Sequence, residues 1–120
     1  MYRMILVDDE PQIRRGLEGL IPWEDYGIEL VGEADNGVSA KILIERVRPD
    51  IAIVDIRMPQ MSGETLMEQI RISGLDCQFI VISAYGDFSV AQKAISLGAA
   101  GYVLKPVSRE ELLEAVRRAG

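Results

Sequence analysis

Acidic, hydroxyl and amine side chains stand at the ends of four short apolar runs of the sequence. They are Asp8 and Asp9 after residues 3–7, Asp55 after residues 50–54, Ser83 at the end of 78–83, and Lys105 at the end of 101–105. If these runs are neighbouring strands that end at one edge of a sheet, their polar groups converge there. Crowded carboxylates repel one another, so either a pKa rises or a cation binds among them.

The chemistry open to this cluster is limited by the absence of histidine from the chain. Ser-His-Asp catalysis, Cys-His catalysis and His-ligated metal sites are therefore excluded. Oxygen ligands alone select a hard cation, Mg²⁺ or Mn²⁺, rather than Zn²⁺. Such a cation, the positive charge of Lys105 and the hydroxyl of Ser83 suit a transferring phosphoryl group, because its charge spreads over three oxygens. Asp55 is then the predicted nucleophile.

Each of these residues also has an ordinary structural explanation. A single acid after a strand, such as Asp8 or Asp9, is more often solvated or caps a helix. A lysine such as Lys105 is more often solvated or salt-bridged. Agreement among four separate strand ends favours a functional site. Glu10, by contrast, is expected only to favour the dipole of the helix that follows it.

Apolar runs alternate along the chain with segments of helical periodicity. The predicted strands are 3–7, 28–34, 50–54, 78–83 and 101–105, and the predicted helices are 11–21, 37–48, 63–73, 88–98 and 108–118. Strict alternation indicates parallel strands joined by right-handed crossovers, with helices on both faces of the sheet. In such folds, ligands bind beyond the carboxyl ends of the strands. Partial alternation in 28–34 predicts an edge strand, but periodicity alone does not fix the strand order.

The composition of the chain is that of one globular domain. It has 120 residues, of which 48% are hydrophobic and 27% charged, and a net charge of −6. Its basic residues form no cluster, so this domain alone is expected not to bind nucleic acid. No apolar stretch approaches the ~20 residues of a membrane span, and the N-terminus lacks a signal-peptide pattern. With Cys77 as the single cysteine, we expect a cytoplasmic protein without an internal disulfide.

Four stretches of the sequence resemble the response-regulator receiver domain of two-component signalling. They are "ILVDDE", "DIAIVDIRMPQMSG", "VISAYGD" and "GYVLKPV", in the order and at the separations of that family. The resemblance covers essentially all of residues 1–120, and the set is far more specific than any one member. It implies a (βα)5 flavodoxin-like fold with a parallel five-stranded sheet in the order 2-1-3-4-5 and helices on both faces.

The resemblance also implies a role for each residue of the acidic cluster. Asp55 accepts the phosphoryl group and contributes to the metal site. Asp9 binds Mg²⁺ directly, Asp8 helps largely through water, and the backbone carbonyl of Arg57 is a further ligand. Lys105 pairs with the phosphate. Together these residues make the domain a phosphoacceptor that depends on Mg²⁺.

Further expectations concern the parts of the receiver family that move. Ser83 is the switch hydroxyl that turns toward the phosphate. Tyr102 holds the position of an aromatic ring that moves between exposed and buried states, although an ordinary strand aromatic is the alternative. The bond between Lys105 and Pro106 is expected to be cis, a form that only about one X-Pro bond in twenty adopts otherwise.

A narrower similarity involves "IPWEDYGIELVGEADNG" together with "SAYGDFSVAQKAISLGAAGYVLKPV". It is similar to receivers of the YesN type, which are joined to an AraC-type helix-turn-helix domain. This implies a C-terminal DNA-binding effector domain outside residues 1–120, a sensor histidine kinase as phosphoryl donor, and a homodimer through the fourth helix, fifth strand and fifth helix. The output is binding, and the only catalysis is the domain's own phosphotransfer and slow autodephosphorylation. Trp23 and Tyr26 are expected to pack under the loop before the second strand.

Alternative functions are weighed against the same residues. A phosphohydrolase of the haloacid-dehalogenase type needs a second aspartate two positions after the nucleophile, where this chain has Arg57. A flavodoxin-like flavin module needs a loop rich in hydroxyls and glycine after the first strand, where this chain has "DDEPQ". A receiver that works without phosphorylation is less consistent with the complete set of acids.

Overall fold

The computed structural model describes residues 1–58, 60–84 and 88–119. Pro59, Tyr85–Asp87 and Gly120 lie outside the described residues. Pro59 and Tyr85–Asp87 belong to two of the motifs quoted above. Within the described part, strands and helices alternate along the chain. They are β1 (Tyr2–Val7), α1 (Pro11–Leu20), the 3₁₀-helix η1 (Trp23–Tyr26), β2 (Ile28–Ala34), α2 (Gly37–Val47), β3 (Ile51–Asp55), α3 (Gly63–Ile72), β4 (Gln78–Ser83), α4 (Phe88–Ser96), β5 (Gly101–Leu104) and α5 (Arg109–Ala119).

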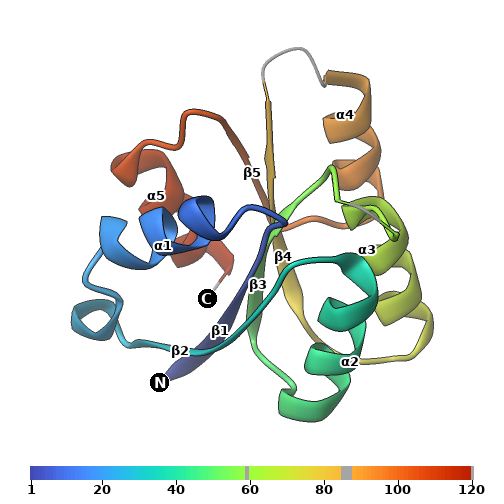
Figure 1. Ribbon diagram of the computed structural model, residues 1–120, viewed down its shortest axis with the longest axis horizontal. Coiled ribbons are helices and arrows are strands. Elements are labelled where there is room, and N and C mark those ends of the chain that lie inside the picture. Colours follow the sequence, from blue (N-terminus) through green and yellow to red (C-terminus); the bar gives the residue numbers. More distant parts are fainter. Residues whose placement is uncertain (59, 85–87, 120) are drawn as a thin grey trace.

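The strands form one parallel sheet in the order β2-β1-β3-β4-β5. This confirms the predicted fold class and places β2 at an edge. Figure 1 shows α1 and α5 on one face of the sheet and α2, α3 and α4 on the other. All strands therefore end at the same edge, which is the condition for the polar groups at their carboxyl ends to meet.

A hydrophobic cluster lies on each side of the sheet. Alternate residues of a strand point to opposite faces. In β3, Ile51 and Ile53 belong to the cluster beneath α1 and α5, whereas Ala52 and Val54 belong to the cluster beneath α2, α3 and α4. The continuous apolar run that precedes Asp55 is thus buried on both faces. This burial holds β3 in place, so that Asp55 lies at the carboxyl edge of the sheet.

Helix starts are set by short-range hydrogen bonds near the site. The Asn36 side chain accepts a hydrogen bond from the backbone N–H of Ser39 at the start of α2. The hydroxyl of Ser108 accepts one from the N–H of Glu111, 3.1 Å away, at the start of α5. These caps satisfy backbone donors that the first turn of a helix leaves free. The polar residues at the helix starts are thus explained by capping, unlike the acids after β1 and β3.

A close approach between α2 and the loop after β3 requires glycine. A Cβ atom at Gly37 would collide with the carbonyl oxygen of Met61. At Gly63 a Cβ would lie 3.0 Å from the Cα of Ile56. Ile56 and Met61, after β3, therefore pack tightly against two helix starts, and Arg57, a predicted metal ligand, follows Ile56 directly.

The segment between α1 and β2 differs from the prediction. It forms η1, which no pattern indicated, because a single short turn leaves little periodicity in the sequence. Trp23 is buried, and its indole N–H donates to the carbonyl of Leu17 at 3.1 Å. Tyr26 is 40% exposed, so the expectation that both aromatics are covered is right for Trp23 and wrong for Tyr26. In the described part of the chain, none of the helices has the length and apolar character needed to cross a bilayer.

Candidate functional site

Four strand ends bring the predicted site residues together at the carboxyl edge of the sheet. Asp8 follows β1, Asp55 ends β3, Ser83 ends β4, and Lys105 follows β5. The Nζ atom of Lys105 lies 3.0 Å from Oδ2 of Asp55 and 3.9 Å from Oδ2 of Asp8. Residues that are far apart in the sequence therefore form one polar cluster.

The acids of this cluster are close enough to share a cation. Asp8, Asp9 and Asp55 each offer a carboxylate oxygen, and these oxygens lie within 4.8 Å of one another. Asp8 and Asp55 are 1% and 6% exposed, whereas Asp9 is open to solvent. A site with two enclosed acids and one open acid can hold a cation and still present it to an incoming group.

A buried carboxylate oxygen in the cluster has no hydrogen-bond partner in the part of the chain that the structure describes. Oδ1 of Asp8 accepts a hydrogen bond from the backbone N–H of Glu10 at 2.9 Å. Asp55 is satisfied by the N–H of Arg57 at 3.1 Å and by the amine of Lys105. Oδ2 of Asp8 is buried and finds no hydrogen-bond donor among the described residues. An unsatisfied, all-oxygen site of this kind fits a hard divalent cation.

The electrostatics of the cluster show an excess of negative charge. Burial, followed by the charges of Asp55 and Asp9, raises the pKa of Asp8 to about 6, although the Glu10 N–H and Lys105 act in the opposite direction. The pKa of Lys105 is raised. Burial alone would lower it, but the hydrogen bond to Asp55 and the negative charge of Asp55 have the larger effect. Lys105 is therefore a fixed positive charge, and it is too little to neutralise the acids around it.

The hydroxyl of Ser83 is fully buried and paired with Tyr102. Its Oγ lies 2.8 Å from the phenolic oxygen of Tyr102, which is half-buried on the neighbouring strand β5. The backbone N–H of Lys105 donates to the carbonyl of Ser83 at 2.8 Å, and the bond between Lys105 and Pro106 is cis. The ends of β4 and β5 are thus tied together directly beside Asp55.

Arg14 is a member of the site that the sequence analysis did not identify. Its guanidinium donates to the backbone carbonyl of Asp8 at 2.6 Å and to the carboxylate of Glu33 at 2.8 Å. It therefore holds the chain at the end of β1 and so orients Asp8. The position of Arg14, one turn into the helix after the acids, is the only signal in the sequence, and it is too common to be informative.

A family model described as the response regulator receiver domain matches residues 4–117. The chain belongs to this family. The receiver is 42% identical to an uncharacterized response regulatory protein of Staphylococcus epidermidis over 112 residues, which are 93% of this chain and 44% of that protein. It is 37% identical to the uncharacterized transcriptional regulatory protein YesN of Bacillus subtilis over 116 residues, 97% of this chain and 32% of that protein.

Solved structures agree with the family assignment. The REC domain of AraT, a response regulator from Geobacillus stearothermophilus, has a TM-score of 0.91 and 40% identity, covering 98% of this receiver and 92% of that chain. A two component transcriptional regulator AraC from Clostridium phytofermentans has a TM-score of 0.87 and 30% identity, covering 99% and 95%. The similarity to YesN and AraC-type regulators is thereby confirmed. The receiver spans less than half the length of the curated relatives named above.

Proposed function

We propose that this receiver is a phosphorylation-dependent switch that accepts a phosphoryl group on Asp55 from a sensor histidine kinase and regulates an attached DNA-binding effector domain. The main support for the proposal is the pairing of Lys105 with Asp55 at 3.0 Å, beside a buried Asp8 oxygen that has no hydrogen-bond partner among the described residues. A nucleophile, a fixed positive charge and a further carboxylate oxygen that can bind a cation are the parts that phosphoryl transfer to a carboxylate needs.

The metal site is assigned to the carboxylates of Asp8, Asp9 and Asp55 and to the backbone carbonyl of Arg57. Mg²⁺ is the expected ion, with Mn²⁺ as an alternative, because the ligands are all oxygens. When bound, the ion neutralises charge on the oxygens of the phosphoryl group. The excess of carboxylates over Lys105 supports this assignment, since a divalent charge would balance it.

In the proposed transfer, a carboxylate oxygen of Asp55 forms a bond to phosphorus while the bond between phosphorus and the donor imidazole breaks. The electron pair of that bond returns to the imidazole nitrogen, which then takes up a proton. The donor histidine belongs to another protein, since this chain has none. Lys105 stays protonated and pairs with the developing charge. The acyl phosphate leaves about −1.5 to −2 charges on Asp55.

The proposed switch begins at the hydrogen bond between Ser83 and Tyr102. A turn of the Ser83 hydroxyl toward the new phosphate would lengthen its 2.8 Å contact with the Tyr102 hydroxyl, and the Tyr102 ring would then be free to take a different position. The active state is favoured by the difference between these two sets of contacts. Output is proposed to pass through α4, β5 and α5, where Ile95 and Leu104 are 55% and 38% exposed and could join two receivers as a homodimer.

The proposed output is regulation of transcription by a longer protein. The relatives include regulatory proteins of which the receiver is less than half, so a DNA-binding effector following residues 1–120 is the natural reading of their names. The receiver itself, with a net charge of −6, is not expected to touch DNA. A reducing, Mg²⁺-containing cytoplasm is the proposed location. Arg57 in place of a second aspartate argues against a rapid phosphohydrolase.

The test is phosphorylation of the purified receiver by acetyl phosphate with Mg²⁺, followed by intact-mass spectrometry. We expect a phosphoryl adduct on the wild type and none on Asp55→Asn, because the amide is not a nucleophile. Asp76→Asn, which changes an exposed aspartate outside the site, is the matched control and should keep the adduct. An undiminished adduct on Asp55→Asn, or repeated rapid turnover of small phosphoesters, contradicts the proposal.

A further inference from the structure

A groove lies at the amino end of the sheet, opposite the acidic cluster. It consists of two adjoining cavities of about 340 and 450 Å³ that share Tyr2 and Tyr26. Ile28, Ile51, Val116 and Arg117 line the first cavity, and Met1, Gly27 and Asp50 line the second. We refer to this feature as the tyrosine groove. The proposed function makes no use of it.

The tyrosine groove is lined in part by exposed apolar side chains. Met1, Tyr2 and Tyr26 are 77%, 45% and 40% exposed, although they adjoin one another around the groove. Adjoining exposed apolar side chains mark a contact surface, whereas scattered ones do not. Tyrosine is also well suited to contacts, since its large ring has few rotatable bonds.

The walls of the groove are held in place by the fold. The backbone N–H of Tyr2 donates to the carbonyl of Gly27 at 2.8 Å, which joins the start of β1 to the end of η1. Gly27 has a φ of 73°, a left-handed conformation that turns the chain from η1 into β2. Ile28, Ile51 and Val116 beneath the tyrosines belong to the buried core. A preformed groove costs little ordering on binding.

The ends of the chain adjoin the tyrosine groove. Met1 and Tyr2 line it from one side, and Val116 and Arg117, in the last turns of α5, line it from the other. Figure 1 shows both ends in this part of the molecule. The receiver spans 44% and 32% of the two relatives. A polypeptide that continues beyond α5 would therefore start within two or three residues of the groove.

We propose that the tyrosine groove binds the first residues of the segment that joins α5 to the effector domain. The segment lies extended, with an apolar side chain between Tyr2 and Tyr26 and a backbone carbonyl toward the guanidinium of Arg117. An extended chain advances about 3.3 Å per residue, so about three residues reach ~10 Å beyond the end of α5. The inference rests on the proposed function, since it requires an attached effector.

Tethering favours this segment over a separate partner protein. A linked segment has an effective concentration of about 1 mM, so even an intrinsic Kd of about 0.2 mM keeps the groove occupied in about five of six molecules. A free partner would need a much larger interface to compete. Because α5 forms one wall, occupancy also couples the segment to the helix through which output is proposed to pass.

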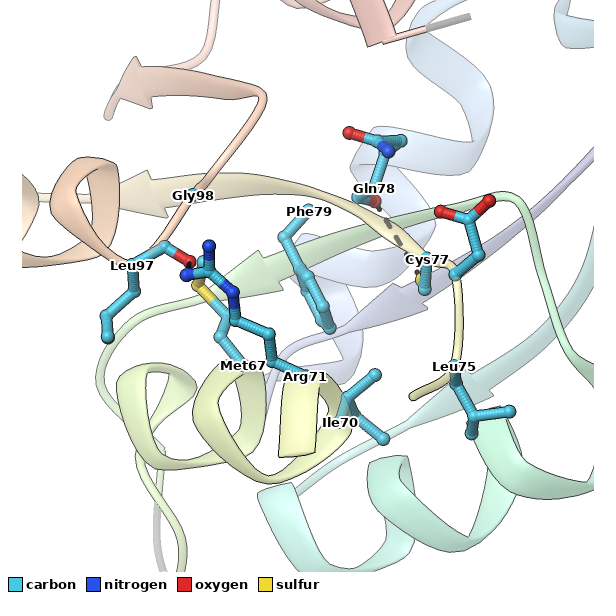
Figure 2. A pocket seen from close by; sticks show the side chains of 10 residues that line it. Met67, Ile70, Arg71, Leu75, Cys77, Gln78, Phe79, Leu97 and Gly98 are labelled. Carbon is cyan, nitrogen blue, oxygen red and sulfur yellow. Dashed lines mark hydrogen bonds between the residues drawn. The ribbon is translucent and has the colours of Figure 1, made fainter. Parts of the chain in front are cut away.

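Another cavity, of about 190 Å³, does not share these properties. It lies between α3, the start of β4 and the end of α4, and Figure 2 shows the Arg71 guanidinium directed toward Leu97. Arg71 donates to the carbonyl of Leu97, so the main cation of this cavity is already used to join α3 to α4. Its remaining lining includes a buried Phe79 and a half-buried Cys77. The cavity is therefore explained as a packing gap.

The test compares tyrosine oxidation by hydroxyl radicals in the 120-residue receiver and in the full-length regulator. We expect the modification rates of Tyr2 and Tyr26 to fall about sixfold in the full-length protein, because about one molecule in six has an open groove at the occupancy above. Tyr102, near the opposite end of the sheet, is the internal control and should react equally in both. Equal rates for Tyr2 and Tyr26 in the two proteins overturn the proposal. So does protection in the receiver alone that rises with its concentration, because a second copy would then cover the groove.

A variant separates docking from folding. In the full-length regulator, Tyr26→Ser should raise the oxidation of Tyr2 to its rate in the receiver alone and speed proteolysis of the segment after α5. Ile72→Ser removes an exposed apolar side chain outside the groove, at the end of α3, and should change neither. Unchanged protection of Tyr2 in Tyr26→Ser counts against the proposal.

The acetyl phosphate adduct is measured on the same samples. An adduct on Asp55 together with tyrosines that are not protected from oxidation refutes only the docking of the segment in the tyrosine groove. Protected tyrosines without an adduct refute the phosphoacceptor alone. The two failures are therefore distinguishable.

Discussion

The two ends of the sheet carry charged residues in opposite arrangements. At the amino end, Asp50 accepts a hydrogen bond from the backbone N–H of Arg3 at 2.8 Å and donates its own N–H to the Arg3 carbonyl at 2.8 Å. The Arg3 guanidinium donates to the carbonyls of Val47 and Arg48 after α2. At the carboxyl end, Asp8 and Asp55 face Lys105, and Asp9 lies beside them. One buried oxygen of Asp8 has no hydrogen-bond partner among the described residues.

This difference teaches how structural and functional charges can be told apart. Arg3 and Asp50 satisfy each other and nearby backbone groups, and so they stabilise the fold without any ligand. Asp8 is buried beside like charges, which raises its pKa to about 6 and costs stability whenever it is ionised. A protein keeps such a cost where a ligand removes it.

The largest expected effect tests whether the amino end keeps the half-buried thiol of Cys77 neutral. Burial, followed by the charges of Asp50 and Asp76, raises the pKa of Cys77, beside β4, from 9.0 to about 12. The thiolate is the reactive form, so at pH 8 the folded receiver should react with iodoacetamide about a thousandfold more slowly than the unfolded chain. Alkylation rates in buffer and in urea measure this. Similar rates would show that Cys77 is not shielded and that the amino end differs less than we argue.

The next effect compares one substitution at the two ends. Without Mg²⁺ at pH 7.5, Asp8→Asn should raise the free energy of unfolding by about 1–3 kcal/mol, since it removes a buried charge whose pKa is raised from 3.8 to about 6. Asp50→Asn should lower it by about 0.5–1 kcal/mol, because a charged acceptor for the Arg3 N–H becomes neutral. Urea unfolding measures both. Mg²⁺ should stabilise the wild type but much less Asp8→Asn.

Changes of the same sign in both variants would break the comparison. Destabilisation by Asp8→Asn would mean that Asp8 is a structural acid, as Asp50 is. Stabilisation by Asp50→Asn would mean that Asp50, too, is repelled by like charges near it.

The buried charge of Asp8 should also make the free energy of unfolding of the wild type depend on pH, with a smaller effect than the substitution. Because the pKa of Asp8 is raised on folding, the folded receiver holds this proton more tightly than the unfolded chain. Its contribution is fully present below pH 3.8 and is lost as the pH rises through about 6. In buffer with EDTA, the free energy of unfolding should fall between about pH 4 and pH 6.5 by about 1–2 kcal/mol more in the wild type than in Asp8→Asn. If the free energies of unfolding of the wild type and Asp8→Asn change in parallel with pH, Asp8 is not the source of the pH dependence.

The sequence was sufficient for the fold class because the strand pattern repeats on both faces of the sheet. The continuous run before Asp55 is typical of a strand covered on both faces, and the partial alternation in β2 indicated an edge strand. Strand order came from the family resemblance, since periodicity says which residues are buried but not which strands are neighbours. The helix η1 and the exposure of Tyr26 lay outside any periodic pattern.

The candidate site was predictable in its members but not in its details. Asp8 and Asp9 are adjacent in the sequence, yet one is buried and the other exposed, because successive residues leave a strand on opposite sides. The hydrogen bond between Ser83 and Tyr102 depends on the pairing of β4 with β5. Arg14 reaches the Asp8 carbonyl from α1. Each detail is a long-range contact that only the assembled sheet creates.

The smallest expected effect tests whether an acid near the end of a strand affects stability when its side chain is exposed. Glu33 lies near the carboxyl end of β2, and its carboxylate is 2.8 Å from Nε of Arg14, but its side chain is 45% exposed. Exposed ion pairs contribute little, so Glu33→Gln should change the free energy of unfolding by less than about 0.5 kcal/mol. Urea unfolding beside Asp8→Asn gives the measurement. A change as large as that of Asp8→Asn would show that any acid at this edge is costly or valuable, and burial would no longer explain why Asp8 marks the site. A negligible change leaves burial beside like charge as the property that distinguishes Asp8 from Glu33.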